Sequence, residues 1–465
     1  MASQDKKSPS ALSAALGKAV EHHRAGDLAK ARTLYLAYLS RNPVHAAAWT
    51  NYGALLRQEQ KFLPAIAAHR RAVEIDPDYT AGRNNLANTL ADDGQFEESA
   101  AIRRALCHQF PREPMRERDL CAALRGMTRH EEVIDRVNRA VEEGWADGEC
   151  RLQRGLSRLM LGDYAGGFAD FEYRYDSAEV SLPKNTPWPR WQGEPLTGKR
   201  VLVLPEQGFG DAILASRFLP WLKALGAEVH AVIKPPLRRL LSDVAGIDQR
   251  LDERPEGGEY DFYIPNMSLP HLTGRGGEIP PLPRLSVPTD SRERARRIIE
   301  PFDSQFKVGI VWTGNAKFKS NNRRSTQPES FAGLAQIPGV QLFSLYKGPA
   351  HQDFIESGMA GLIVDACGHD RDFADSAAII DEMDLMITTD TAVVHVAGSL
   401  EKPIWNLLSH ESFWLYGLGE TTPWYPSMRL FRQRAQGDWN ELFTRVENTL
   451  REHLSRQATA SDAAG

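Results

Sequence analysis

Residues 46–79 read AAAWTNYGALLRQEQKFLPAIAAHRRAVEIDPDY, and this stretch decides the architecture of the first third of the chain. Small residues stand where two helices would cross, an aromatic residue opens the second half, and Pro77 lies near the end. The same classes of residue recur at intervals of 34 residues on both sides. A period of 34 is typical of solenoids built from paired helices.

Four sets of positions keep this period. Small residues let the two helices of a pair approach closely, apolar residues fill the gap beside them, and prolines stop the second helix. His130 is the one polar member of the apolar set. The sets are Ala19, Gly53, Ala87, Cys121 and Gly155; Leu28, Phe62, Phe96 and Tyr164; Ala31, Ala65, Ser99 and Gly167; and Pro43, Pro77 and Pro111.

The chain resembles tetratricopeptide repeats. The matching consensus positions are Trp49, Tyr52, Gly53, Ala65, Ala72 and Pro77. The resemblance covers about five units, and the last two are the most divergent. The units are 12–45, 46–79, 80–113, 114–147 and 148–181. An irregular helical bundle is the alternative. Such solenoids bind an extended or helical segment of another protein on their concave face, so the resemblance implies a protein partner.

Composition narrows the class of protein. A net charge of −5 over 465 residues, with no long Lys/Arg block, argues against nucleic acid as a partner. No apolar run is long enough for a membrane span or a signal peptide. The four cysteines are far apart and form no Cys-x-x-Cys pair, which predicts reduced, structural thiols in a cytoplasmic protein. We expect disorder over 1–11 and in a tail at 457–465.

The pattern changes at a segment rich in proline and tryptophan, 182–199, which predicts an ordered linker with its tryptophans packed at a domain junction. Short apolar runs then alternate with amphipathic stretches, as in doubly wound parallel sheets. We predict one Rossmann-like domain over 200–300 and a second over 301–456. Expected strands are 201–204, 228–233, 308–312, 341–345, 362–364, 385–388 and 404–408; expected helices are 212–225, 237–244, 291–300, 373–383 and 392–399. A cleft should lie between the carboxyl ends of the two sheets.

The first candidate site follows the first of these strands. Gly208 and Gly210 permit close backbone approach, and the amino terminus of the next helix favours negative charge. Asp211 can either cap that helix or face the cleft, and the two interpretations are equally open.

The second candidate is the stretch from Trp312 to Asn315, with Gly314 inside it, followed by basic and hydroxyl side chains. These are Lys317, Lys319, Arg323, Arg324 and Ser325. Such groups beside a strand end could neutralise a phosphate leaving group. A solvated basic loop is the alternative.

The third candidate lies where the strand predicted over 385–388 ends. Thr389, Asp390, Thr391 and Ala392 open a helix whose exposed N–H groups form an anion site, and His395 lies four residues past Thr391 on the same helical face. An N-capped helix with a buried core histidine is the alternative.

These three elements, together with Lys402-Pro403 and the segment 424–433, resemble glycosyltransferases of the GT-B fold. The likeness is strongest to bacterial heptosyltransferase-like enzymes fused behind tetratricopeptide repeats. The resemblance implies Asp211 as general base. It implies donor binding by the glycine turns and the third element: Gly208, Gly210, Gly314, Thr389, Asp390, Thr391, Ala392 and His395. It implies leaving-group stabilisation by Lys317, Arg324 and Asn315.

The resemblance also implies a substrate and a partner. It implies a nucleotide-sugar co-substrate without a further cofactor, and transfer to Ser or Thr of a protein held by the repeats, with flagellin and a nonulosonic acid as candidates. Many heptosyltransferases carry glycine where Ala392 stands, which weakens the case for an ADP-heptose donor. No metal is expected, because no Asp-x-Asp motif is apparent at a strand end. A lipopolysaccharide or other glycan acceptor, and a scaffold without catalytic activity, are the alternatives.

Overall fold

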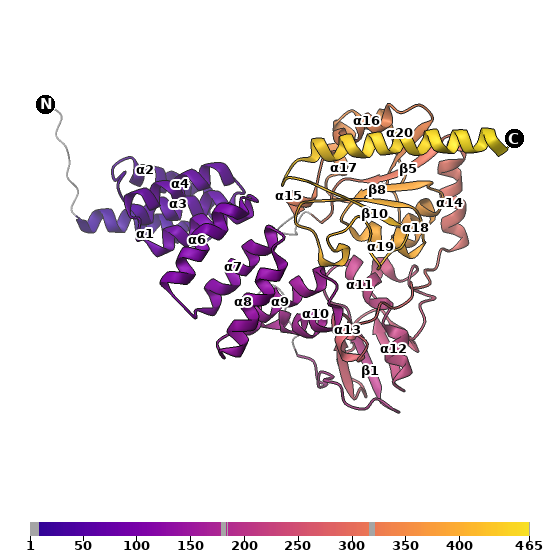
Figure 1. The fold of residues 1–465 in the computed structure, drawn as a ribbon, viewed down its shortest axis with the longest axis horizontal. Helices are drawn as coiled ribbons and strands as arrows, with labels where there is room; N and C mark the ends of the chain where they lie inside the picture. The colour runs from indigo at the N-terminus through magenta and orange to yellow at the C-terminus, as the bar shows by residue number, and fades with distance from the viewer. Residues whose placement is uncertain (1–8, 178–182, 184, 316–320, 465) are drawn as a thin grey trace. The chain divides into compact units, whose positions relative to one another are not determined.

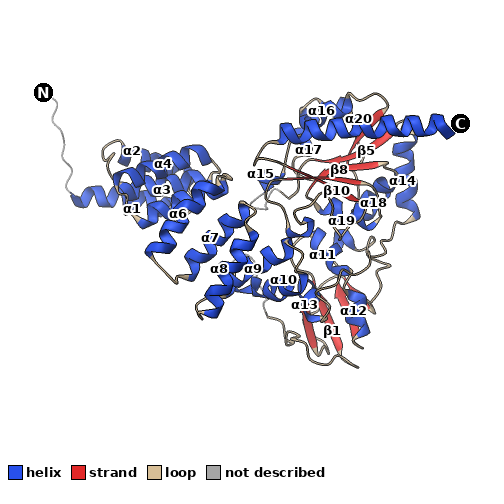
Figure 2. Cartoon of the chain, viewed as in Figure 1, coloured by secondary structure: helices blue, strands red, loops and turns tan. Residues whose placement is uncertain are grey.

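The computed structural model describes residues 9–177, 183, 185–315 and 321–464, and the chain divides into two compact units. The first unit ends at Cys150 and the second begins at Arg151. Figure 1 traces the order of the elements and Figure 2 separates helices from strands. Helical repeats come first and two parallel α/β sheets follow, which confirms the predicted fold class.

The first unit consists of consecutive helix pairs. Its helices are α1 Pro9–Arg24, α2 Leu28–Leu39, α3 Ala46–Gln58, α4 Phe62–Ile75, α5 Thr80–Asp92, α6 Phe96–Gln109, α7 Pro114–Gly126 and α8 His130–Glu142. The apolar positions of the period are the first residues of the second helices, as Phe62 and Phe96 show. Ion pairs keep the period too: Arg70–Glu98 is repeated 34 residues on as Arg104–Glu132. These ion pairs therefore repeat with the same period as the sequence.

The turn inside each pair also repeats, which the sequence patterns did not predict. Its backbone is left-handed at Gly26, Gly94 and Gly162, with φ of 81°, 84° and 88°. Gln60 and Thr128 hold the same position with φ of 58° and 57°. Glycine adopts this conformation without cost, whereas a side chain strains it.

The second unit begins inside a helix pair, α9 Gly148–Met160 and α10 Tyr164–Phe171, with the 3₁₀ turn η1 Glu172–Asp176 after it. Gly155 and Gly167 let these helices approach, because a Cβ on Gly167 would lie 2.6 Å from Leu159 Cγ. Leu159 and Phe168 share one hydrophobic cluster with residues of both sheets. The fifth helix pair is thus packed into the α/β unit.

The first sheet is parallel, in the order β3-β2-β1-β4. Its strands are β1 Arg200–Leu204, β2 Glu228–Val232, β3 Gln249–Leu251 and β4 Phe262–Pro265. The expected linker is partly sheet: Trp191 N–H donates to Tyr263 O at 3.0 Å and Tyr263 N–H to Pro189 O at 3.0 Å. Trp188 packs against Leu202 and Tyr263. These bonds satisfy the open edge of β4, which a free linker would leave unpaired.

Two helix predictions in this half are corrected. The helix expected over 212–225 is two, α11 Phe209–Ser216 and α12 Leu219–Ala224, because Pro220 has no N–H to continue a single helix. The helix expected over 237–244 is only the short η2 Pro235–Leu237 followed by turns. The Arg250 guanidinium donates hydrogen bonds to the carbonyl oxygens of Leu241 and Val244. The apolar side chains of this stretch remain buried.

The second sheet is parallel, in the order β10-β9-β8-β5-β6-β7. Its strands are β5 Phe306–Val311, β6 Val340–Ser344, β7 Ile363–Asp365, β8 Leu385–Thr389, β9 Ile404–Leu408 and β10 Met428–Arg432. The other helices of this unit are α13 Leu269–Leu272, α14 Thr289–Ile299, α15 Asn321–Arg324, α16 Ala332–Ala335, α17 His351–Glu356, α18 Phe373–Asp381, α19 Ala392–Ser399 and α20 Trp439–Ala464. Short 3₁₀ turns are η3 Asn266–Ser268, η4 Glu300–Phe302, η5 Pro328–Phe331, η6 Met359–Gly361 and η7 Trp414–Tyr416.

The expected disordered ends are corrected where the structure describes them. Helix α20 continues through Ala464, so 457–464 is helical rather than a disordered tail. Leu442, Val446 and Leu450 bury one face of this helix, and a well-anchored helix extends readily into an alanine-rich end. At the amino end α1 already begins at Pro9, while 1–8 lies outside the described residues.

Within the described part of the chain, no helix combines the length and the apolar character that crossing a membrane requires.

Candidate functional site

The first predicted turn joins β1 to α11. Gln207 has a left-handed backbone, with φ of 48°, and α11 begins two residues later at Phe209. Asp211, in the first turn of α11, accepts the Gly208 N–H through Oδ2 at 2.8 Å. The structure therefore shows the helix-capping contact of Asp211, and its role as general base stays a prediction.

Besides this contact, the surroundings of Asp211 shift the pKa of its carboxyl. Burial raises its pKa, and the negative charge of Asp390 raises it further, whereas the Gly208 hydrogen bond and Lys234 act in the opposite direction. Asp390 belongs to the loop after β8 in the second sheet, so the two predicted elements share one electrostatic environment. A carboxylate whose pKa is raised toward neutrality is a better proton acceptor.

Lys234 lies two residues beyond β2 and was not predicted from the sequence. Its ammonium donates to the Gln207 carbonyl and lies 5.6 Å from the centre of the Phe209 ring. Burial lowers its pKa, while Asp211 opposes that shift. The only available signal was its place just after a strand, on the same sheet edge as Asp211.

The third predicted element forms the turn from β8 into α19. Thr391 caps α19 by accepting the Val393 N–H at 3.3 Å. Asp390 accepts the Tyr416 hydroxyl at 2.6 Å and lies 3.5 Å from Arg324 Nη1. Thr389 is buried and donates to Val311 O at 3.4 Å, so its hydroxyl is used inside the sheet.

His395 brings the first and third elements together. Its ring is buried, and its Nδ1 lies 2.9 Å from the Tyr425 hydroxyl. A Cβ on Gly210 would lie 2.6 Å from His395 Cδ2 and 3.5 Å from the Ala392 Cα, so only glycine fits there. Burial lowers the pKa of His395 to about 4, which keeps the ring neutral. Its donor-binding role stays a prediction, and the structure adds a packing role.

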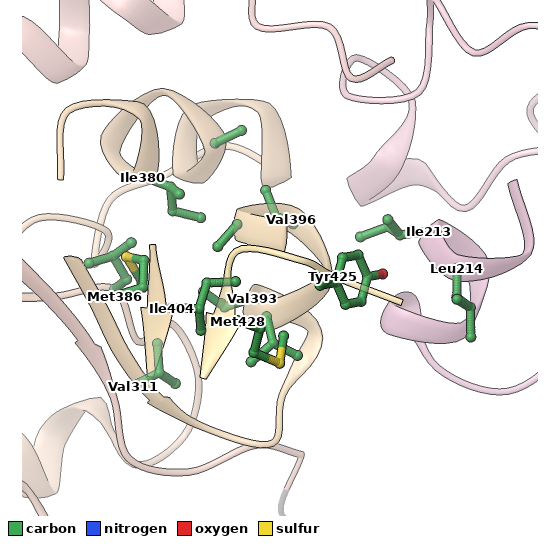
Figure 3. Packing of buried hydrophobic residues seen from close by; sticks show 14 of the residues in the cluster. Ile213, Leu214, Val311, Ile380, Met386, Val393, Val396, Ile404, Tyr425 and Met428 are labelled. Atoms are coloured by element: carbon green, nitrogen blue, oxygen red, sulfur yellow. The ribbon is translucent and has the colours of Figure 1, made fainter. Parts of the chain in front are cut away.

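Figure 3 shows the packing of buried hydrophobic residues near Tyr425, the hydrogen-bond partner of His395. Ile213 and Leu214 of α11 lie beside Tyr425, and Val393 and Val396 of α19 lie on its other side, within one hydrophobic cluster. The two sheets therefore meet through α11 and α19, the helices that follow β1 and β8.

The second predicted element folds back on itself beside Asp390. Thr313 and Ser325 hydroxyls lie 2.8 Å apart, and Asn321 Nδ2 donates to Thr313 Oγ1 at 3.0 Å. A Cβ on Gly314 would lie 2.9 Å from Arg324 Nη2, so glycine again permits a close approach.

The basic residues of this loop face acidic groups from neighbouring loops. Arg323 pairs with Glu411 at 3.1 Å, and Arg324 lies close to Asp390. The basic loop is therefore partly paired within the site. Asn315 is exposed, and Lys317 and Lys319 lie outside the described residues, so the predicted roles of these three residues stay predictions.

The described residues contain no group of three or more His, Cys, Asp or Glu side chains arranged to hold a metal ion.

The chain is similar in sequence to a known protein. No family model matches the chain. Protein FlbA of Caulobacter vibrioides is 25% identical over 447 residues, covering 90% of this chain and 69% of that protein.

The solved structures that resemble the chain are distant. A glycosyl transferase family 9 structure from Veillonella parvula covers 52% of this chain and 88% of that one, with 16% identity and a TM-score of 0.40. A tetratricopeptide repeat protein from Parabacteroides merdae covers 36% of this chain and 66% of that one, with 18% identity and a TM-score of 0.32. At these scores the matches support no further argument, and the fold rests on the chain's own helices and sheets.

Proposed function

We propose that the chain is a glycosyltransferase of the GT-B type that transfers a sugar from a nucleotide sugar to a Ser or Thr hydroxyl of a protein. One observation carries the proposal: Asp211, in the helix after β1, and Asp390, in the loop after β8, share one electrostatic environment where α11 meets α19. GT-B chemistry needs such a site, in which one half offers a base and the other an anion-binding turn.

In the proposed reaction the acceptor hydroxyl attacks the anomeric carbon of the donor sugar. Asp211 accepts the hydroxyl proton, a new carbon–oxygen bond forms, and the bond to the nucleotide phosphate breaks with its electron pair leaving on the phosphate. The turn at Asp390 to Ala392 would face the donor, and Arg324 and Lys317 would offset the charge of the leaving phosphate. No metal is required in this scheme.

The helix pairs of the first unit would hold the acceptor protein, with flagellin as the candidate and a nonulosonic acid as the sugar. The four cysteines are free and three are buried, which suits a reducing compartment, so we place the reaction in the cytoplasm.

The test is intact-mass spectrometry of flagellin, and of any protein that co-purifies with the chain. Cells carry the wild-type chain, Asp211→Asn or His395→Ala, at matched expression. We expect a sugar mass in the wild type that Asp211→Asn removes. An acceptor that keeps the full added mass in both variants would refute the proposed mechanism.

A further inference from the structure

A buried ion pair joins the last helical turn to the candidate catalytic turn. Arg174 belongs to η1, directly after α10, and its side chain is 1% exposed. It donates to both carboxylate oxygens of Glu206, at 2.7 and 2.9 Å, and to Ser268 Oγ at 2.9 Å. A two-point Arg–carboxylate pair fixes orientation as well as distance.

Glu206 is held from several other sides. Its backbone N–H donates to Asn266 Oδ1 at 3.1 Å, and the Tyr175 hydroxyl donates to its carboxylate at 2.7 Å. Burial alone would raise the pKa of Glu206, but Arg174 and Tyr175 hold it below its ordinary value. This carboxylate therefore stays charged and keeps its partners.

The next residue, Gln207, carries the backbone strain of the turn. Its side chain donates to Glu206 Oε1 at 3.2 Å, and its carbonyl accepts from Lys234. A non-glycine residue with φ of 48° persists only where its surroundings determine it. Here anchored groups lie on both sides of the strained residue, four positions before Asp211.

We propose that Arg174 is a positioning residue: through Glu206 it holds the strained turn from Gln207 to Asp211 in the geometry that places Asp211 opposite α19. The inference rests on the proposed role of Asp211. It assigns η1, which lies within the fifth unit of the sequence period, to the support of the transfer site. Arg174 itself contacts no reacting group.

The first test is amide hydrogen exchange over residues 205–211 in the full chain. Arg174→Met is compared with Arg154→Met, because Arg154 also forms a buried two-point pair, with Asp170 at 2.7 and 2.8 Å, that joins α9 to α10. We expect Arg174→Met to speed exchange in the turn about tenfold or more over Arg154→Met. Equal exchange in the two variants would overturn the proposal.

The second test follows transfer to the acceptor found for the wild type. Arg174→Met should lower kcat while KM changes little, and it should move the acid limb of the pH profile to lower pH, because a loosened turn hydrates Asp211. Arg174→Lys should restore part of the lost kcat and reverse part of the shift in the pH profile. A loosened turn with unchanged kcat and unchanged pH profile would overturn the proposal.

The two proposals fail in different ways. If the wild type transfers no sugar to any protein or glycan acceptor, the proposed function is refuted. The exchange comparison then still decides whether Arg174 holds the turn.

Discussion

In each unit of the molecule a buried histidine packs against a glycine. The two contacts differ in how far apart in the sequence the joined residues lie. In the repeats, a Cβ on Gly53 would lie 2.6 Å from His69 Cε1, across the hairpin of α3 and α4. In the α/β unit, Gly210 of α11, beside the first sheet, contacts His395 of α19, beside the second sheet. His395 has the Tyr425 hydroxyl as a partner, whereas neither ring nitrogen of His69 has a hydrogen-bond partner among the described residues.

The difference separates a local packing contact from one that lies at the candidate site. His69 fills a slot in a local repeat, where an apolar ring would serve as well. His395 is tied to both halves of a site whose parts are far apart in sequence. Burial lowers the pKa of both rings to about 4, so the shift alone does not distinguish them.

The largest expected effect comes from filling the long-range contact. Gly210→Ala should abolish transfer and destabilise the α/β unit by about 1–3 kcal/mol, because the new Cβ meets a ring held by Tyr425. Gly208→Ala is the matched control for stability, since its Cβ would meet only Asp211 Oδ2, at 3.1 Å. Urea unfolding compares the two variants, and transfer assays follow Gly210→Ala. Equal destabilisation by the two substitutions would contradict the close packing assigned to Gly210.

The pH dependence of folding should be similar in the two units. Folded His69 and His395 resist protonation, with a pKa of about 4, whereas an unfolded histidine titrates near pH 6.5. The unfolded chain therefore binds more protons below pH 6.5, and stability present at neutral pH falls as the pH drops toward 4. The loss should reach roughly 3 kcal/mol per histidine at pH 4. Hydrogen exchange of α3–α4 and α11–α19 peptides against pH measures it.

Replacing each histidine with phenylalanine should change the stability of the two units in opposite directions. His69→Phe should stabilise the repeats by about 1–3 kcal/mol, because it removes two buried nitrogens without partners, and it should flatten their pH dependence between 4 and 6.5. His395→Phe should instead destabilise the α/β unit through the lost Tyr425 bond. Destabilisation of the repeats by His69→Phe would contradict a stability cost from these two nitrogens.

The smallest expected effect lies in the turns of the repeats. Thr128→Gly and Gln60→Gly should each stabilise the first unit by about 1 kcal/mol, because they relieve a left-handed backbone at a position that Gly26 and Gly94 fill elsewhere. Gly94→Thr, the reverse change, should cost a similar amount. Thermal unfolding of the full chain measures the series, and a neutral or negative effect of both glycine variants would contradict the strain.

The repeats were largely predictable because their contacts are local. The period placed Phe62, Phe96 and His130, which are the first residues of α4, α6 and α8. The period of the left-handed turns was not predicted, because Gln60 and Thr128 stand where the other three turns have glycine. Strand β10 is not among the predicted strands, because a short apolar run cannot be assigned as a strand without its pairing neighbour, here β9.

The candidate site was predictable only in parts. Strand ends indicated Asp211, Asp390 and Thr391. The meeting of Gly210 with His395, and the links from Arg174 to Glu206 and from Lys234 to Gln207, depend on tertiary packing that no local pattern carries.

The most direct test of the central claim is the pKa of Asp211, read by carbon NMR of aspartate-labelled full-length protein and assigned with Asp211→Asn. We predict a pKa above the ordinary aspartate value that falls in Asp390→Asn and rises in Lys234→Met, because one neighbouring charge raises it and the other lowers it. An Asp211 that titrates at the ordinary value and ignores both substitutions would contradict a site shared by the two sheets.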